Sequence, residues 1–291
     1  MTAAAIESAS APGKPWAVLP VLAGFAAMYL PTYWWAANGI WQSDDNGHGP
    51  IILAVVLWLF WGVRKPLTSL PDERNAAWGW PVFILGLLLY ALGRAFSVSI
   101  FELGSQLLVV AGGLLLLKGV DGLRMAWFAV LFFVFMIPLP GMLVDAATGP
   151  LKEWISDIVT EVLHAAGYPI ARTGVMLSIG QYQLLVADAC SGLNSMFSLS
   201  ALGTLFMYLM GRKSVLHNAL MLAAILPVAF VANIVRVIVL VLVTYHLGDE
   251  AGQGFLHGTA GMVLLVVALC FLFLVDLVLC RLIPQRATDA K

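Results

Sequence analysis

The stretch NALMLAAILPVAFVANIVRVIVLVLVTY, residues 218–245, decides the fold class. It contains one charged side chain, Arg236, within a run that is otherwise almost wholly apolar. A transmembrane helix needs about 20 mainly apolar residues to cross the hydrocarbon core of a bilayer. The stretch exceeds this length, so the sequence predicts that it spans a membrane.

The rest of the chain has the same character. Of its 291 residues 61% are hydrophobic and 11% are charged, whereas about 25% are charged in an average soluble domain. Seven further segments approach the length of a span: 16–37, 49–63, 78–94, 99–117, 125–140, 190–210 and 258–281. We therefore expect an all-α polytopic membrane protein with eight transmembrane helices.

The positions of Lys and Arg predict the orientation, because short cytoplasmic loops carry an excess of them. With the N-terminus inside, eleven of the 15 basic residues lie inside and three, Arg94, Lys152 and Arg172, lie outside. The C-terminus is then inside too. We expect a disordered cytoplasmic N-terminus over 1–15, a single membrane domain over 16–282 and a cytoplasmic tail over 283–291.

The outer loop 141–189 is the longest segment that is not expected to span the membrane. In its first part, one helix face is apolar and the other carries charge, which predicts an amphipathic helix that lies on the membrane or caps the bundle. The apolar face comprises Leu151, Trp154, Ile155, Ile158, Val159 and Val162. The second part, 168–189, has short apolar runs with β-branched residues and glycines, and predicts a small β-hairpin.

Composition also excludes some classes of function. The net charge is −1, whereas a nucleic-acid partner would demand a basic face. The cysteines Cys190, Cys270 and Cys280 form no CxxC pair and no cluster at metal-ligand spacing. We expect no metal and no cofactor, and the lipid bilayer is the first partner.

Cys190, in VADACSGLNS, follows the expected hairpin and opens the sixth span on the outer side. The N-terminus of a helix stabilises a thiolate, and the backbone N–H groups of Ser191 and Gly192 are available to an oxyanion. Cysteine is also common there as a small apolar residue. Asp188 is suited to orienting a histidine, positioning a substrate or capping the helix.

Arg236 carries a stronger signal, since an arginine at the membrane centre costs roughly 2.5 to 3.5 kcal/mol or more and should face protein or a polar cavity. Asn233 lies on the same helix face and is placed to hold the guanidinium by a hydrogen bond. The alternative is an arginine that clamps the bundle through an acid or through backbone carbonyls.

His257, in GQGFLHGTAG, lies at the outer start of the eighth span. Considered alone, His257 is equally consistent with a residue that merely lies at the membrane–water interface. The topology, however, puts Cys190, Arg236 and His257 at one level of the membrane. A thiolate, an imidazole and a guanidinium together suffice for acyl transfer by covalent catalysis.

Two other polar residues remain open. His48, at the end of the outer loop SDDNGHG, is available to a substrate, but a turn built on Asp and Gly is favoured. Glu102, in the fourth span, is placed to pair with Arg94 or Arg236 or to contact a substrate.

Three motifs in the last three spans carry a resemblance: ACSGLNS at 189–195, NIVR at 233–236 and HGTAG at 257–261. With NGHGP at 46–50 and IPLP at 137–140, the chain resembles the exosortases. The resemblance implies a cysteine transpeptidase or protease of the bacterial inner membrane, with Cys190 as nucleophile, Arg236 as oxyanion or carboxylate partner and His257 as acid and base. Asn194 and the NGHGP loop favour the B subtype.

The resemblance also implies the substrates, which are exported proteins with a PEP-CTERM sorting signal: a Pro-Glu-Pro motif, a transmembrane helix and a basic tail. The acyl group would pass to water or to an amine acceptor linked to exopolysaccharide or lipid. The alternative is a transporter or a noncatalytic subunit of an exopolysaccharide export system. An intramembrane metalloprotease is disfavoured, because the sequence contains no HExxH motif.

Overall fold

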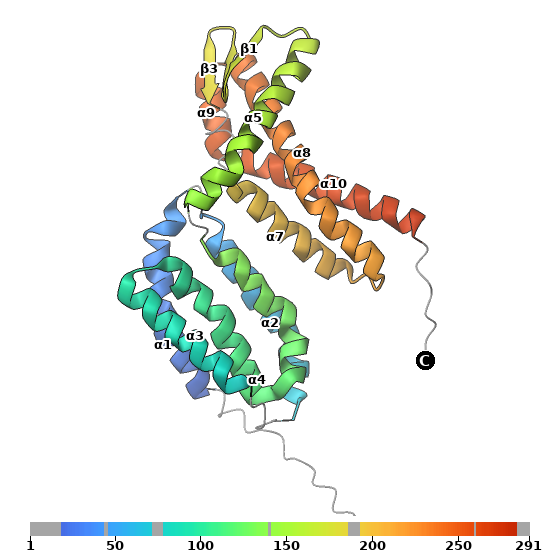
Figure 1. Cartoon of the computed structure of the whole chain (residues 1–291). Helices are drawn as coiled ribbons and strands as arrows, with labels where there is room; N and C mark the ends of the chain where they lie inside the picture. The colour runs from blue at the N-terminus through green and yellow to red at the C-terminus, as the bar shows by residue number, and fades with distance from the viewer. Residues whose placement is uncertain are drawn as a thin grey trace, which may run out of the picture. The chain divides into compact units, whose positions relative to one another are not determined.

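The computed structural model describes residues 19–43, 46–71, 78–138, 141–185, 193–258 and 260–283. The described side chains exclude those of residues 19, 141–145, 147–148, 193–196, 255–258 and 260. The chain divides into two compact units, Met1–Pro138 and Leu139–Lys291. Figure 1 shows the helices and strands of both units.

The first unit is entirely helical in the part that the structure describes. Its long helices are α1 (Leu19–Ala37), α2 (Gly49–Ser69), α3 (Gly79–Phe96) and α4 (Ser99–Phe132). Two short 3-10 helices, η2 (Ile40–Gln42) and η3 (Phe133–Met136), follow α1 and α4. These helices correspond to the first five predicted spans, two of which are joined in α4.

Helix α4 is interrupted at Gly119, whose φ of 66° and ψ of −162° are not helical. Before the break, Lys118 donates a hydrogen bond to the carbonyl of Leu70 at the end of α2 (2.8 Å). After it, the backbone of Phe135 hydrogen-bonds to His48 at the start of α2. The chain therefore runs back along α2 after Gly119. The predicted spans 99–117 and 125–140 are present as helical segments, the second of which is helical up to Met136. One glycine replaces the loop expected between them.

Helices α3 and α4 approach closely at small residues, as is common in membrane bundles. A Cβ added at Gly112 would lie 2.6 Å from the backbone N of Phe83, whereas one at Gly113 would meet nothing within 4 Å. We predict that Gly112→Ala destabilises the protein by about 1–3 kcal/mol through overpacking. Gly113→Ala is the control and should be neutral or slightly stabilising. Thermal unfolding in detergent measures both, and equal melting temperatures would contradict the prediction.

The second unit combines helices with a small sheet. Its helices are α5 (Gly141–Ala165), α7 (Leu193–Met210), α8 (Val215–Leu247), α9 (Asp249–Gly258) and α10 (Ala260–Leu282). Strands β1 (Ile170–Thr173), β2 (Met176–Ile179) and β3 (Tyr182–Leu185) form one antiparallel sheet in the order β1-β2-β3. The predicted hairpin is thus present, and a second two-residue turn at 180–181 returns the chain into a third strand that was not predicted.

The C-terminal half of α8 packs against α5 and the sheet. We call this the sheet cluster; its buried members are Ile155, Val159, Leu163, Ile170, Leu177, Ile179, Val237, Leu240 and Val241. The predicted amphipathic helix is confirmed as α5, which packs against α8 and the sheet. Trp154 and Val162, expected on its apolar face, are 64% and 47% exposed. The buried stripe of α5 is narrower than the apolar face, because this helix buries Ile155, Val159 and Leu163 in the sheet cluster and packs Leu151 against it only partly buried.

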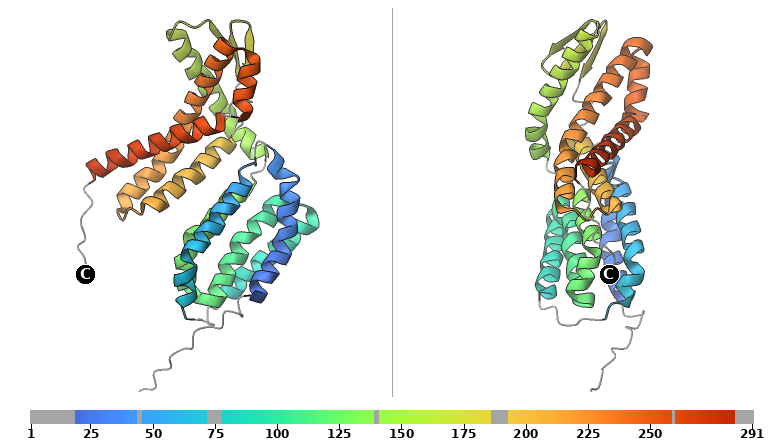
Figure 2. Two further views of the ribbon diagram at one scale, coloured as in Figure 1. Left: turned by 180° about the vertical axis from the view of Figure 1, so that it is seen from behind. Right: turned by 90° about the vertical axis from the view of Figure 1, so that its right-hand side faces the viewer.

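The N-terminal half of α8 packs against α7 and α10, as Figures 1 and 2 show. We call this the helix cluster; its buried members are Leu199, Met221, Ile225, Val228, Ala229, Ala232, Leu264, Ala268 and Leu272. Helix α8 thus contributes to two apolar cores in succession along its length.

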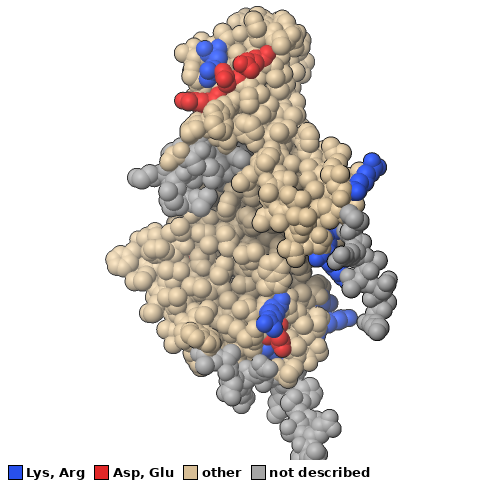
Figure 3. All heavy atoms as spheres, turned by 45° about the vertical axis from the view of Figure 1, so that its right-hand side comes forward, with Lys and Arg blue, Asp and Glu red and all other residues tan. Residues whose placement is uncertain are grey.

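In the described part of the chain, five helices are long and apolar enough to cross a membrane. They are Gly49–Ser69, Gly79–Phe96, Ser99–Met136, Val215–Leu247 and Gly261–Leu282. On the face that Figure 3 shows, charged side chains occur in a few small groups with wide areas between them. The chain is a helical, polytopic membrane protein, as predicted; the number of eight spans stays a prediction.

Candidate active site

Arg236 lies where the two apolar cores of α8 meet. Ala232 is the last buried α8 residue of the helix cluster and Val237 is the first buried α8 residue of the sheet cluster, against which the partly buried Phe230 and Ile234 also pack. Between them, Asn233 and Arg236 are 1% and 6% exposed. The prediction that Arg236 faces protein is confirmed. A polar layer inside a membrane protein is costly, and this marks it as a candidate functional site.

Asn233 does not make the hydrogen bond expected of it. Its Oδ1 atom is buried and accepts no hydrogen bond from any residue of the described chain, the guanidinium of Arg236 included. Side chains three residues apart share a helix face, but they meet only in some combinations of rotamers. The layer therefore holds a buried acceptor that is open to a donor from elsewhere, and a buried acceptor without a donor is unfavourable.

Four predicted site residues, Asp188, Cys190, Ser191 and Gly192, lie outside the described residues. The chain on either side of them is described. Strand β3 ends at Leu185, and its residues pack on the sheet cluster. Helix α7 begins at Leu193 and contributes Leu199 to the helix cluster. The chain thus passes from one cluster to the other between Leu185 and Leu193.

His257 lies in the last turn of α9, and its side chain is outside the description. The eighth span was expected to begin at 258, but a separate helix, α9, precedes it. Gly252 of α9 packs closely against Thr244 near the end of α8, and Leu264 of α10 belongs to the helix cluster. Between Gly252 and Leu264 the chain again passes from the end of α8 to the helix cluster.

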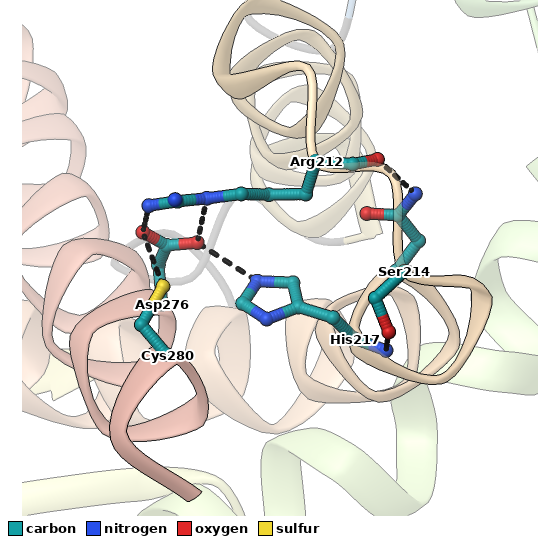
Figure 4. Close-up of polar contacts among 6 residues, drawn as sticks. Arg212, Ser214, His217, Asp276 and Cys280 are labelled. Carbon is teal, nitrogen blue, oxygen red and sulfur yellow. Dashed lines mark hydrogen bonds and ion pairs between the residues drawn. The ribbon is translucent and has the colours of Figure 1, made fainter. Parts of the chain in front are cut away.

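Sequence reasoning did not anticipate a second buried ionic group, shown in Figure 4. The carboxylate of Asp276 on α10 accepts hydrogen bonds from Arg212 (2.7 Å, Nη2 to Oδ2) and His217 (2.9 Å, Nε2 to Oδ1). The signal was present, since an acid in an apolar span is as unusual as an arginine. Its partners were not predictable locally, because they lie 64 and 59 residues away.

The same group holds the one set of possible metal ligands found among the described residues. One ligand atom each of His217, Asp276 and Cys280 lies within 4.8 Å of the others. The guanidinium of Arg212 contacts both carboxylate oxygens of Asp276, at 2.7 and 3.3 Å. A metal cation would have to displace the guanidinium of Arg212 from the carboxylate of Asp276, so these residues do not favour a metal site.

Comparison with known proteins agrees with the motifs in the last three helices. The family model for the transmembrane exosortases matches residues 34–274, which is most of the chain. The chain belongs to the transmembrane exosortase family. No curated protein and no solved structure matches it. The family resemblance is confirmed, while the B subtype stays a prediction.

Glu102 of this exosortase is part of the first unit's own packing. Its carboxylate is buried and accepts hydrogen bonds from Thr32 (2.6 Å) and Arg94 (3.1 Å), both to Oε1. Of the two arginines considered from the sequence, Arg94 is thus the one that pairs with it. A contact to substrate stays a prediction, but the ion pair already explains why an acid is tolerated at this position.

We predict that Arg94→Ala destabilises the exosortase by about 3 kcal/mol, because it leaves the Glu102 carboxylate buried without its cation. Glu102→Gln should remove most of this cost when it is combined with Arg94→Ala. Chemical or thermal unfolding of the two single variants and the double variant forms a double-mutant cycle. Additive effects in the cycle would show that the pair has no energetic coupling.

His48 lies at the turn before α2. Its ring donates a hydrogen bond to the backbone carbonyl of Phe135, and burial lowers its pKa below the usual value despite this bond. The imidazole therefore links the start of α2 to η3. The favoured interpretation of the loop as a turn agrees with this, and substrate binding by His48 stays a prediction.

Proposed function

We propose that this exosortase is a cysteine transpeptidase or protease of the bacterial inner membrane. It cleaves the C-terminal PEP-CTERM sorting signal of exported, membrane-anchored proteins on the periplasmic side. Cys190 is the nucleophile, His257 the acid and base, and Arg236 the group that stabilises the oxyanion. The observation that carries the proposal is the buried polar layer of Asn233 and Arg236 between two apolar cores.

The course of the chain supports a meeting of the three residues at that layer. The segment that contains Cys190 joins β3 of the sheet cluster to α7 of the helix cluster. The segment that contains His257 joins the end of α8 to the part of α10 in the helix cluster. Arg236 lies at the boundary between the same two clusters.

The reaction has two displacements. The Cys190 thiolate attacks the scissile carbonyl carbon, and the guanidinium of Arg236 stabilises the oxyanion. The C–N bond then breaks, His257 gives a proton to the departing amine, and a thioester remains on Cys190. In the second displacement an acceptor amine, or water, gives a proton to His257 and attacks the thioester, which frees the thiolate.

The surroundings of Arg236 suit this chemistry. Hydrogen bonds to a developing charge are worth more where water is excluded, because nothing must reorganise as the charge forms. A buried thiolate is costly, and a fixed cation nearby offsets that cost. The open acceptor of Asn233 is available to an N–H group of the substrate backbone, which would orient the scissile bond.

Trapping the acyl intermediate tests the proposal most directly. A substrate with a PEP-CTERM tail is co-expressed with the exosortase, the membranes are quenched in acid, and the peptide that contains Cys190 is analysed by mass spectrometry. We expect a Cys190 thioester that hydroxylamine removes. Processing of the substrate without any adduct at Cys190, or processing that survives Cys190→Ala, would refute the mechanism.

A further inference from the structure

We infer that Asp276, together with Arg212 and His217, is a positioning group that fixes the register of α10 against α8. It thereby sets the level at which the chain that carries His257 meets Arg236. The inference rests on the proposed function, since these are the residues whose relative position it concerns.

The ionic group joins three parts of the chain. The side chains of His217 and Asp276 are 1% and 5% exposed, and Arg212 reaches Asp276 from the loop between α7 and α8. Ser214 caps α8 by accepting a hydrogen bond from the backbone N–H of His217. Asn218 donates to the carbonyl of Arg212 at 2.9 Å. The two donors are therefore held in place before they meet the carboxylate (Figure 4).

Helices α8 and α10 run in opposite directions. Asp276, near the end of α10, meets the first turn of α8, whereas α9, just before α10, meets the end of α8 at Thr244. Starting from the His217–Asp276 contact, each further helical turn brings one residue of α8 level with one residue of α10. The pairs at one, two and three turns are Met221 with Leu272, Ile225 with Ala268, and Ala229 with Leu264. All six side chains are buried in the helix cluster.

This apolar seam gives little preference for one register. In a membrane, lipid tails solvate apolar side chains about as well as another helix does, so sliding by one turn exchanges similar contacts. A buried polar residue does specify a register, as a single asparagine does in coiled coils. Sliding α10 would leave Asp276, Arg212 and His217 without their hydrogen bonds, and unpaired buried charges are costly.

The buried stripe of α8 that begins at His217 continues through the helix cluster to Arg236. Arg236 lies nineteen positions after His217, so the ionic group acts on the proposed site from about 28 Å along the helix. A slip of one turn would move α10 by about 5.4 Å and carry the preceding chain, with His257, away from the level of Arg236.

Disulfide cross-linking measures the register without reference to activity. In the full chain with Cys270→Ala and Cys280→Ala, Ile225→Cys is paired with Ala268→Cys at the same level, or with Leu264→Cys or Leu272→Cys one turn away. With Asp276 intact, the 225–268 pair should give the highest yield. In Asp276→Leu its yield should fall and the yield of a one-turn pair should rise. His217→Leu with Asp276→Leu repeats the test without an unpaired imidazole, and the remaining partner, Arg212, is 29% exposed and can extend toward water.

Substrate processing is measured on the same variants in a chain with native cysteines. A misplacement of about 1 Å can cost about 100-fold in rate, so kcat should fall by at least this factor in Asp276→Leu while KM changes little. Asp276→Asn keeps an acceptor oxygen for His217 and should restore both register and most of the rate. Leu274→Ala, on the exposed side of α10, is the control and should change neither.

The outcomes separate the two proposals. An unchanged cross-linking pattern in both leucine variants overturns the role in register, whatever happens to processing. A changed pattern with unchanged kcat overturns the link to Arg236 and His257. If the unmodified chain fails to process any PEP-CTERM substrate, the proposed function fails, and the cross-linking result alone still decides the register.

Discussion

Replacement of Cys190 by alanine should abolish processing of a PEP-CTERM substrate, with a loss of at least about 10⁴-fold in rate. The thiolate forms the bond that replaces the scissile C–N bond, and alanine offers no nucleophile. Residual cleavage would require direct attack by water with help from Arg236 and His257 alone. Immunoblots of the co-expressed substrate, at matched levels of folded exosortase, measure the effect.

Cys270→Ala and Cys280→Ala are the matched controls for that experiment. Cys270 is exposed. The thiol of Cys280 makes a long hydrogen bond of 3.9 Å to the carboxylate of Asp276. Both changes should leave processing within about twofold of the unmodified chain, as expected of substitutions away from a site. Full processing by Cys190→Ala would instead favour the noncatalytic alternative, in which the chain serves an export machine.

Hydropathy predicted where the chain crosses a membrane better than where its helices end. The second span was expected to end at 63, just before Arg64 and Lys65, yet α2 continues to Ser69. Arg64 stacks over the ring of Trp61 at 3.5 Å from its centroid. A basic residue ends the apolar run, but it does not end a helix, and long basic side chains at the interface extend toward water.

The residues of the predicted site also differ in this respect: the local sequence predicts some of them, whereas the contacts of others depend on how the helices pack. Arg236 was predictable because a charge in an apolar run has a large energetic cost, which the sequence alone reveals. The partner of Glu102 was left between Arg94 and Arg236, because pairing depends on how helices pack. Asn233 was assigned a bond that it does not make, since spacing on a helix fixes the face of a side chain but not its rotamer.

Asp276 shows the limit most clearly. It carries the same signal as Arg236, but its place toward the inner side of the last span predicts only a structural role. The distinction lay in its contacts with Arg212 and His217, which come from the distant loop and first turn of α8. Such contacts follow from the packing of α10 on α8, and no periodicity within either segment encodes their register.

Arg236→Lys should lower kcat by about 100-fold while the protein keeps its fold. Lysine preserves the charge but lacks the planar fork that donates two parallel hydrogen bonds. Burial also favours the neutral form of an amine, so a lysine at this position would lose part of the charge that an arginine keeps. Kinetics on solubilised enzyme with a peptide substrate, beside a thermal melt of the same sample, measure both quantities.

Arg94→Lys provides the matched control, because it makes the same change at another arginine, in the last turn of α3. Arg94 contacts Glu102 through a single nitrogen, and its side chain is 51% exposed, so an ammonium group can replace it with little loss.

The division of the effect of Arg236→Lys between kcat and KM then distinguishes the roles open to Arg236. Stabilisation of an oxyanion exists only in the transition state and changes kcat, whereas binding of a substrate carboxylate changes KM. A clamp that only holds the bundle together changes neither constant, but it lowers the melting temperature. A fall in kcat at constant KM and constant melting temperature is therefore the result that only the proposed role produces.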